Sequence, residues 1–130
     1  MYNVLVCDDE KDIVSALQIY LKSEGYQVFS AYNGKEALKI INREDIQLVL
    51  MDIMMPVMNG YEATKMIRSL DREDAKKIPI IAMTANAFTE DRIRAKEAGM
   101  DEHVAKPVDV ELLIKVIHKL VKYNGYGSDK

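Results

Sequence analysis

Short apolar segments alternate along the chain with longer segments in which apolar residues recur at helical spacing. Runs of about four to six apolar residues that end at a polar or turn-forming residue are typical of buried strands. On this pattern we predict five strands, at Asn3–Cys7, Gln27–Ala31, residues 46–51, residues 79–83 and Glu102–Ala105. The second of these alternates between apolar and polar residues, which favours a place at the edge of a sheet.

Helices are predicted after each strand, because apolar residues return there every three or four positions. In the first helix, Ile13 and Leu17 fall on one face, and Gly25 ends the pattern. The predicted helices cover residues 12–24, 34–43, 61–70, 89–98 and 109–123. The apolar stripe of the fourth, chiefly Ile93 and Ala98, is thin, so this helix is either lightly packed or keeps one face for another role.

Five strand–helix repeats predict an α/β fold. Parallel strands joined by helices use right-handed crossovers, which place helices on both faces of the sheet. A closed barrel of eight such units would need about 250 residues, and this chain has 130. We therefore predict one doubly wound, open parallel sheet, followed by a polar tail at residues 124–130 that we expect to be mobile.

Composition narrows the class of protein without naming a function. The 48% hydrophobic and 30% charged residues are those of an ordinary globular domain. A net charge of −3 gives no reason to expect direct binding to nucleic acid, and no apolar run reaches the roughly 18 residues of a membrane span. The N-terminus lacks a signal-peptide pattern, and the single cysteine cannot form an internal disulfide. We expect a cytoplasmic protein that contacts neither nucleic acid nor membrane.

Chemically active side chains follow four of the predicted strands. They are Asp8 and Asp9 after the first strand, Asp52 after the third, Thr84 after the fourth and Lys106 after the fifth. The carboxyl ends of parallel strands share one edge of a sheet, so we expect these side chains to converge. Neighbouring carboxylates repel one another unless a cation neutralises them, and Mg²⁺ or Mn²⁺ suits such oxygen ligands. An aspartate beside that cation can attack phosphorus, and a lysine and a hydroxyl can stabilise the phosphoryl oxygens.

These residues and their surroundings resemble the receiver domain of two-component response regulators. The resemblance is carried by the pair Asp8-Asp9, by Asp52 in MDIMMPVMNG, by Thr84 in PIIAMTA and by Lys106-Pro107. Each motif is weak alone, but the set in this order is very specific, and it extends over about residues 3–121. It implies a flavodoxin-like fold with five helices and strand order 2-1-3-4-5, in a receiver domain at residues 1–123.

The resemblance assigns the phosphorylation chemistry to Asp52. Asp52 would be the phosphoacceptor, which takes a phosphoryl group from a histidine kinase or a phosphotransfer protein. Asp9, Asp52 and the backbone carbonyl of Met54 would bind Mg²⁺ or Mn²⁺ as the cofactor. Asp8 would act mainly through water bound to the metal ion.

The resemblance also assigns the residues that respond to the phosphoryl group. Lys106 would pair with Asp52 before the reaction and with a phosphoryl oxygen after it, and a cis peptide bond would join Lys106 to Pro107. Thr84 would swing inward to another phosphoryl oxygen. Three residues before Lys106, receivers usually carry a Tyr or Phe that rotates inward with this threonine, whereas this chain has His103. His103 is either a surface residue of a short strand or a switch residue whose behaviour depends on pH.

Two other functions fit parts of this pattern. Phosphatases of the haloacid dehalogenase type also use a strand-terminal aspartate and Mg²⁺, but they need a second acid two residues later, where this chain has Met54. A degenerate receiver that only binds partners would not need the complete set of acids, threonine and lysine. We therefore favour a phosphorylation-controlled switch that catalyses only its own phosphorylation and dephosphorylation.

The output of such a switch stays open at this point. The first half of the chain is most similar to receivers of transcription factors, whereas PIIAMTANAF and EAGMDEHVAKPVD are more similar to receivers of hybrid sensor kinases. The chain is therefore either a stand-alone receiver or a part of a longer protein. A phosphorylation-dependent dimer is one form that the output could take.

Overall fold

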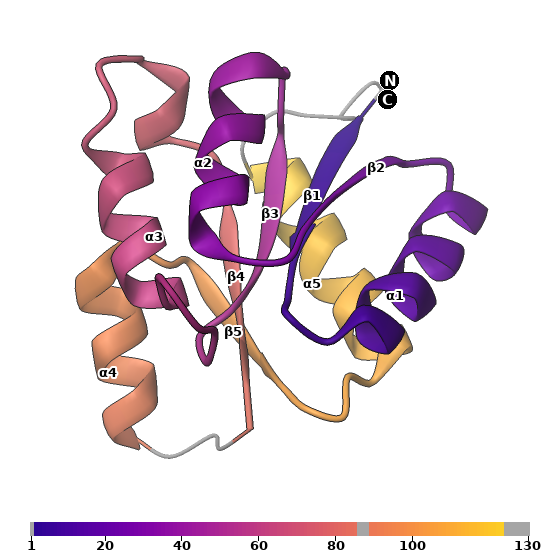
Figure 1. The fold of residues 1–130 in the computed structure, drawn as a ribbon. Coiled ribbons are helices and arrows are strands. Elements are labelled where there is room, and N and C mark those ends of the chain that lie inside the picture. Colours follow the sequence, from indigo (N-terminus) through magenta and orange to yellow (C-terminus); the bar gives the residue numbers. More distant parts are fainter. Residues whose placement is uncertain (1, 86–88, 124–130) are drawn as a thin grey trace.

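The computed structural model describes residues 2–85 and 89–123 and has the predicted α/β architecture (Figure 1). Five parallel strands form one sheet in the order β2-β1-β3-β4-β5, which confirms the predicted order. The strands are β1 (Asn3–Cys7), β2 (Gln27–Ala31), β3 (Leu48–Asp52), β4 (Ile80–Thr84) and β5 (Glu102–Ala105). The third and fourth strands begin slightly later than predicted and extend to Asp52 and Thr84.

Helices cover both faces of the sheet, as predicted. They are α1 (Lys11–Ser23), α2 (Gly34–Arg43), α3 (Gly60–Arg68), α4 (Thr89–Ala98) and α5 (Val110–Tyr123), with a short 3₁₀-helix, η1 (Asp74–Lys76), after α3. In Figure 1, α1 and α5 lie on one side of the sheet, and α2, α3 and α4 lie on the other. None of the described helices is long and apolar enough to cross a membrane. The tail that we expected to be mobile lies outside the described residues.

Alternation along the central strands builds two separate cores. In β3, Leu48 and Leu50 pack in the core beneath α1 and α5, whereas Val49 and Met51 pack in the core beneath α2, α3 and α4. Every residue of β3 and of β4 is buried, as expected of strands that are covered on both faces. This packing fixes the strand ends, where the polar side chains stand.

Candidate functional site

Four strand ends meet at one edge of the sheet. The strand register places Asp52 next to the penultimate residue of β4, and Thr84 next to the last residue of β5. Asp8 directly follows β1, and Lys106 directly follows β5. Residues that are far apart in the sequence are thus carried to the same edge by the parallel topology.

Three carboxylates stand together at this edge. Oxygen atoms of Asp8, Asp9 and Asp52 lie within 4.8 Å of one another. Asp8 and Asp52 are buried, whereas Asp9 is exposed to solvent. Two backbone amides orient the buried pair: the N–H of Glu10 donates to Asp8 Oδ1 (2.9 Å), and the N–H of Met54 donates to Asp52 Oδ1 (3.1 Å). These bonds leave Oδ2 of each of the two carboxylates facing the ammonium group of Lys106.

Lys106 supplies that positive charge. Its Nζ atom lies 2.8 Å from Asp8 Oδ2, 3.3 Å from Asp52 Oδ2 and 3.7 Å from Glu10 Oε1. Burial acts to lower the pKa of Lys106, but attraction to Asp8 and Asp52 outweighs it and raises the pKa. The ammonium group is therefore charged at neutral pH and ties the end of β5 to the ends of β1 and β3. The peptide bond between Lys106 and Pro107 is cis.

The carboxyl group of Asp52 holds its proton more tightly than an ordinary aspartate does, chiefly because it is buried. Burial and the negative charge of Asp8 raise the pKa of Asp52 to about 6. The hydrogen bond from Met54 and the charge of Lys106 act in the opposite direction without cancelling the rise. A cation bound beside Asp52 would favour the ionised form of its carboxyl group.

The oxygen atoms of the site fit a hard divalent cation. Asp8 Oδ2 is buried and accepts no well-formed hydrogen bond from the described residues, so its contact with the Lys106 ammonium at 2.8 Å is an ion pair. Carboxylate oxygens with access to water are the ligands that Mg²⁺ and Mn²⁺ prefer. Met54, whose backbone carbonyl we predicted as a further ligand, belongs to the loop that follows Asp52.

The loop between Asp52 and α3 is tightly built. The N–H of Gly60 donates to the carbonyl of Ile53 (3.3 Å), and a Cβ atom on Gly60 would collide with the carbonyl oxygen of Asp52. The side chain of Asn59 caps α3. Within the loop, Val57 has φ of 70°, a left-handed conformation that is costly for a β-branched residue. The sequence pattern gave no signal for this strained position.

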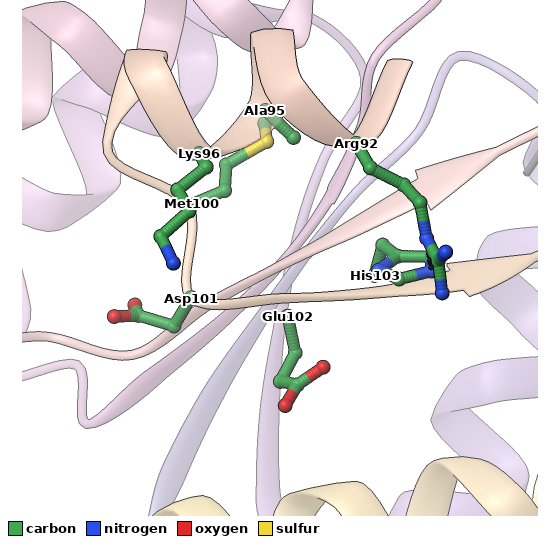
Figure 2. A pocket seen from close by; sticks show the side chains of 7 residues that line it. All are labelled: Arg92, Ala95, Lys96, Met100, Asp101, Glu102 and His103. Carbon is green, nitrogen blue, oxygen red and sulfur yellow. Dashed lines mark hydrogen bonds between the residues drawn. The ribbon is translucent and has the colours of Figure 1, made fainter. Parts of the chain in front are cut away.

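His103 lies in β5 and faces α4. Thr84 is buried at the end of β4, whereas His103 is partly exposed and lines a pocket between α4 and β5. Figure 2 shows the His103 ring beside Arg92 of α4, whose Nε donates to His103 Nε2 at 2.9 Å. Arg92 was not predicted from the sequence, because no periodicity or motif relates a residue of α4 to a residue of β5.

Known proteins share this fold. Residues 4–118 match the family model described as response regulator receiver domain. The response regulator SaeR of Staphylococcus epidermidis is 40% identical over 114 residues, which are 88% of this chain and 48% of that protein. The chemotaxis protein CheY4 of Vibrio cholerae is similar in structure, with a TM-score of 0.87 and 30% identity over 92% of this chain and 98% of that chain.

A receiver from a sensor kinase is similar as well. The receiver domain of sensor histidine kinase PA1611 of Pseudomonas aeruginosa has a magnesium ion coordinated in its active site cleft. It matches with a TM-score of 0.82 and 33% identity, over 95% of this chain and 98% of that chain. By contrast, this chain spans only about half of the SaeR regulators, 48% in Staphylococcus epidermidis and 54% in Staphylococcus aureus.

Proposed function

Because the chain belongs to the response regulator receiver domain family of two-component signalling, we propose that Asp52 accepts a phosphoryl group and thereby switches the binding of a partner. The observation that carries this proposal is the setting of Asp52 at the end of β3. Its side chain is 2% exposed, lies within 4.8 Å of two other carboxylates and is 3.3 Å from an ammonium group. Repulsion makes such a cluster costly, so its presence at a ligand-binding edge supports a chemical role.

The proposed reaction uses side chains that already stand at the strand ends. One carboxylate oxygen of Asp52 would attack the phosphorus of a phosphohistidine. A P–O bond forms, the P–N bond breaks and the imidazole leaves with the electron pair. Lys106, 3.3 Å from Asp52 Oδ2, would stabilise the charge on the transferred oxygens. Thr84, buried at the end of the neighbouring strand, would donate a hydrogen bond to another phosphoryl oxygen.

A divalent cation completes the proposal. Asp9, Asp52 and the backbone carbonyl of Met54 would hold Mg²⁺ or Mn²⁺, and Asp8 would act mainly through water. When bound, the cation supplies the positive charge that reduces repulsion between the carboxylates and an incoming phosphoryl group. The buried Asp8 oxygen without a well-formed hydrogen bond supports this role, as does the magnesium ion in the PA1611 receiver domain.

The partners follow from the same chemistry. A histidine kinase or a phosphotransfer protein would be the donor, and the output would be a changed affinity for a protein partner, with a phosphorylation-dependent dimer as one form. The chain would catalyse only its own phosphorylation and dephosphorylation. A phosphatase that turns over substrates would need a general acid two residues after Asp52, and Met54 at that position has no proton to give.

Intact-mass spectrometry after incubation with acetyl phosphate and Mg²⁺ tests the proposal. We expect the wild type to gain one phosphoryl group, and we expect no gain for Asp52→Asn or after chelation of the metal ion. Asp45→Asn is a matched control, because Asp45 is exposed and precedes β3 at its opposite end. Labelling that persists in Asp52→Asn would exclude Asp52 as the acceptor. No labelling by acetyl phosphate or by purified histidine kinases would indicate a receiver that only binds partners.

A further inference from the structure

Glu10 is the solvent-facing member of the acids around Lys106. Its carboxylate oxygen Oε1 lies 3.7 Å from Lys106 Nζ, and its side chain is 64% exposed. The other two carboxylates that contact this ammonium group belong to Asp8 and Asp52, and both are buried. Among these three acids, Glu10 is therefore the one that a molecule arriving from solvent meets first.

The side chain of Glu10 does not cap the helix that it precedes. Glu10 is the N-cap residue of α1, and its side chain makes no capping hydrogen bond with the described backbone. By contrast, the side chains of Asn33 and Asn59 cap α2 and α3. Asparagine, aspartate, serine and threonine are the residues preferred at this position. Capping of α1 therefore does not account for a glutamate here, and its carboxylate lies beside Lys106 instead.

The backbone of Glu10 is held by both the site and the helix. Its N–H donates to Asp8 Oδ1 at 2.9 Å, and its carbonyl oxygen accepts from the N–H groups of Ile13 and Val14 at 3.1 Å and 3.2 Å. An exposed ion pair such as that between Glu10 and Lys106 contributes little to stability. Together with the anchored backbone, however, it keeps the Glu10 carboxylate at the entrance to the site.

Negative charge surrounds this entrance. Asp9 is also exposed, and one of its oxygen atoms lies within 4.8 Å of oxygen atoms of Asp8 and Asp52. In the proposed function Asp9 binds the divalent cation and shares its charge with it, whereas Glu10 is not one of the ligands. With the cation in place, the exposed carboxylate in contact with Lys106 would therefore keep its charge uncompensated by the metal ion.

The leaving group of a phosphodonor meets this charge. In the proposed reaction an oxygen of Asp52 attacks phosphorus and the leaving group departs on the opposite side, which faces solvent because Asp52 is buried. Acetyl phosphate breaks a P–O bond and releases acetate, an anion. Phosphohistidine and phosphoramidate break a P–N bond and the nitrogen keeps the electron pair, so a protonated imidazole or amine leaves as a neutral molecule. A fixed negative charge opposes the first kind of donor more than the second.

We propose that Glu10 is a specificity-determining residue, whose carboxylate disfavours phosphodonors that release an anion and thereby favours transfer from phosphohistidine. This inference rests on the proposed function, because it concerns the reaction of Asp52 with its donor. It adds that the chain reacts more slowly with acyl phosphates for a local electrostatic reason. Neutralising this one side chain should relax the discrimination.

Rates of phosphorylation with two small donors test the proposal. Wild type, Glu10→Gln and Asp12→Asn are incubated with acetyl phosphate or with phosphoramidate at saturating Mg²⁺, and intact mass follows the gain of one phosphoryl group. Glu10→Gln nearly keeps the shape of the side chain and removes its charge. Asp12→Asn is the matched control, because Asp12 is exposed in the first turn of α1 and has no ion pair with Lys106 among the described residues.

We expect the two donors to respond differently. Glu10→Gln should react with acetyl phosphate about three- to tenfold faster than the wild type, and with phosphoramidate less than about twofold faster. Asp12→Asn should keep both rates within about twofold of the wild type. Raising the NaCl concentration from about 0.05 M to about 0.5 M should shrink the difference with acetyl phosphate, because salt screens an exposed charge.

Four results would overturn the inference. Equal acceleration with both donors in Glu10→Gln would show that Glu10 acts on Lys106 or Asp52 and not on the donor. An unchanged rate with acetyl phosphate would show that the charge of Glu10 does not oppose this donor. The same change of selectivity in Asp12→Asn would show that Glu10 has no special role. If neither donor labels the wild type, the proposed function fails as well, whereas the first three results leave it intact.

Discussion

The sheet edge that carries Asp52 and the face formed by α4 and β5 are built in opposite ways. At the sheet edge, β3 is buried throughout, and the buried Asp8 and Asp52 are each oriented by a backbone amide. At the other face, Val104 is the one buried residue of β5, and only Ala95 and Ala98 are buried among the described side chains of α4. The two regions are adjacent, because β4, which ends at Thr84, lies between β3 and β5 in the sheet.

This difference fits two separate demands of a molecular switch. Transfer of a phosphoryl group needs its participants in fixed positions, which close packing around the strand ends provides. A change in partner binding needs an element that moves at a small cost in free energy, which a helix with little buried surface provides. The rigid edge and the lightly held helix therefore complement each other.

The largest effect should come from disturbing the rigid edge at Gly60. A Cβ atom in Gly60→Ala would overlap with backbone atoms of Asp52 and Ile53, which cannot move without displacing β3. We expect the free energy of unfolding to fall by about 3 kcal/mol or more, measured by urea denaturation. Gly25→Ala is the control, because Gly25 has positive φ but no atom within 4 Å of the added carbon. Gly25→Ala should lower the free energy of unfolding by only about 1 kcal/mol. Equal losses of stability in Gly25→Ala and Gly60→Ala would contradict the tight fit at Gly60.

Removing the charge of Asp52 should have a smaller effect on the free energy of unfolding. It should raise this free energy, whereas Gly60→Ala lowers it. The pKa of Asp52 is about 6 in the folded protein against an ordinary value of 3.8, so the folded state binds more protons than the unfolded state between these pH values. The contribution of Asp52 to stability is therefore complete at low pH and is lost as the pH rises through 6. Without divalent cations at pH 7, Asp52→Asn should be more stable than the wild type by about 2 kcal/mol.

Urea denaturation in a chelating buffer, repeated from pH 3.5 to pH 7.5, checks this expectation. The difference between Asp52→Asn and the wild type should vanish at the acid end of the series. Added Mg²⁺ should stabilise the wild type more than the variant, because an ion that binds only the folded state adds to its stability. A difference that does not depend on pH would show that the ionisation of Asp52 is not its cause.

The two regions also differ in how far they could be predicted from the sequence. Asp8, Asp52, Thr84 and Lys106 directly follow or end apolar runs, and parallel topology then brings such positions to one edge without further information. The contact between Arg92 and His103 depends on how one side chain of α4 lies over β5. No periodicity encodes that distance, so the contact appears only when both elements are placed in space.

The strain at Val57 was hidden from the sequence for a similar reason. Valine gives no signal of a left-handed backbone, and the φ of 70° at Val57 appears only in the folded loop between Asp52 and α3. Val57→Gly should relieve this strain and raise the free energy of unfolding by about 1 kcal/mol, after the larger chain entropy of glycine is subtracted. Val57→Ala, which removes the β-branch but keeps a Cβ atom, should gain less. A loss of stability in Val57→Gly would show that contacts of the valine side chain stabilise this loop.

The smallest effect is expected on the lightly held helix. Ile93 is 52% exposed, so Ile93→Ala should change the free energy of unfolding by less than about 0.5 kcal/mol. A truncated core isoleucine would cost about 2 to 5 kcal/mol, and urea denaturation separates these outcomes easily. A loss above about 1 kcal/mol that grows with protein concentration would mean that Ile93 is covered by a second copy in solution. A loss of that size at every concentration would mean that α4 is firmly packed against the rest of the protein. The contrast between a rigid sheet edge at Asp52 and a movable face at α4 would then not hold.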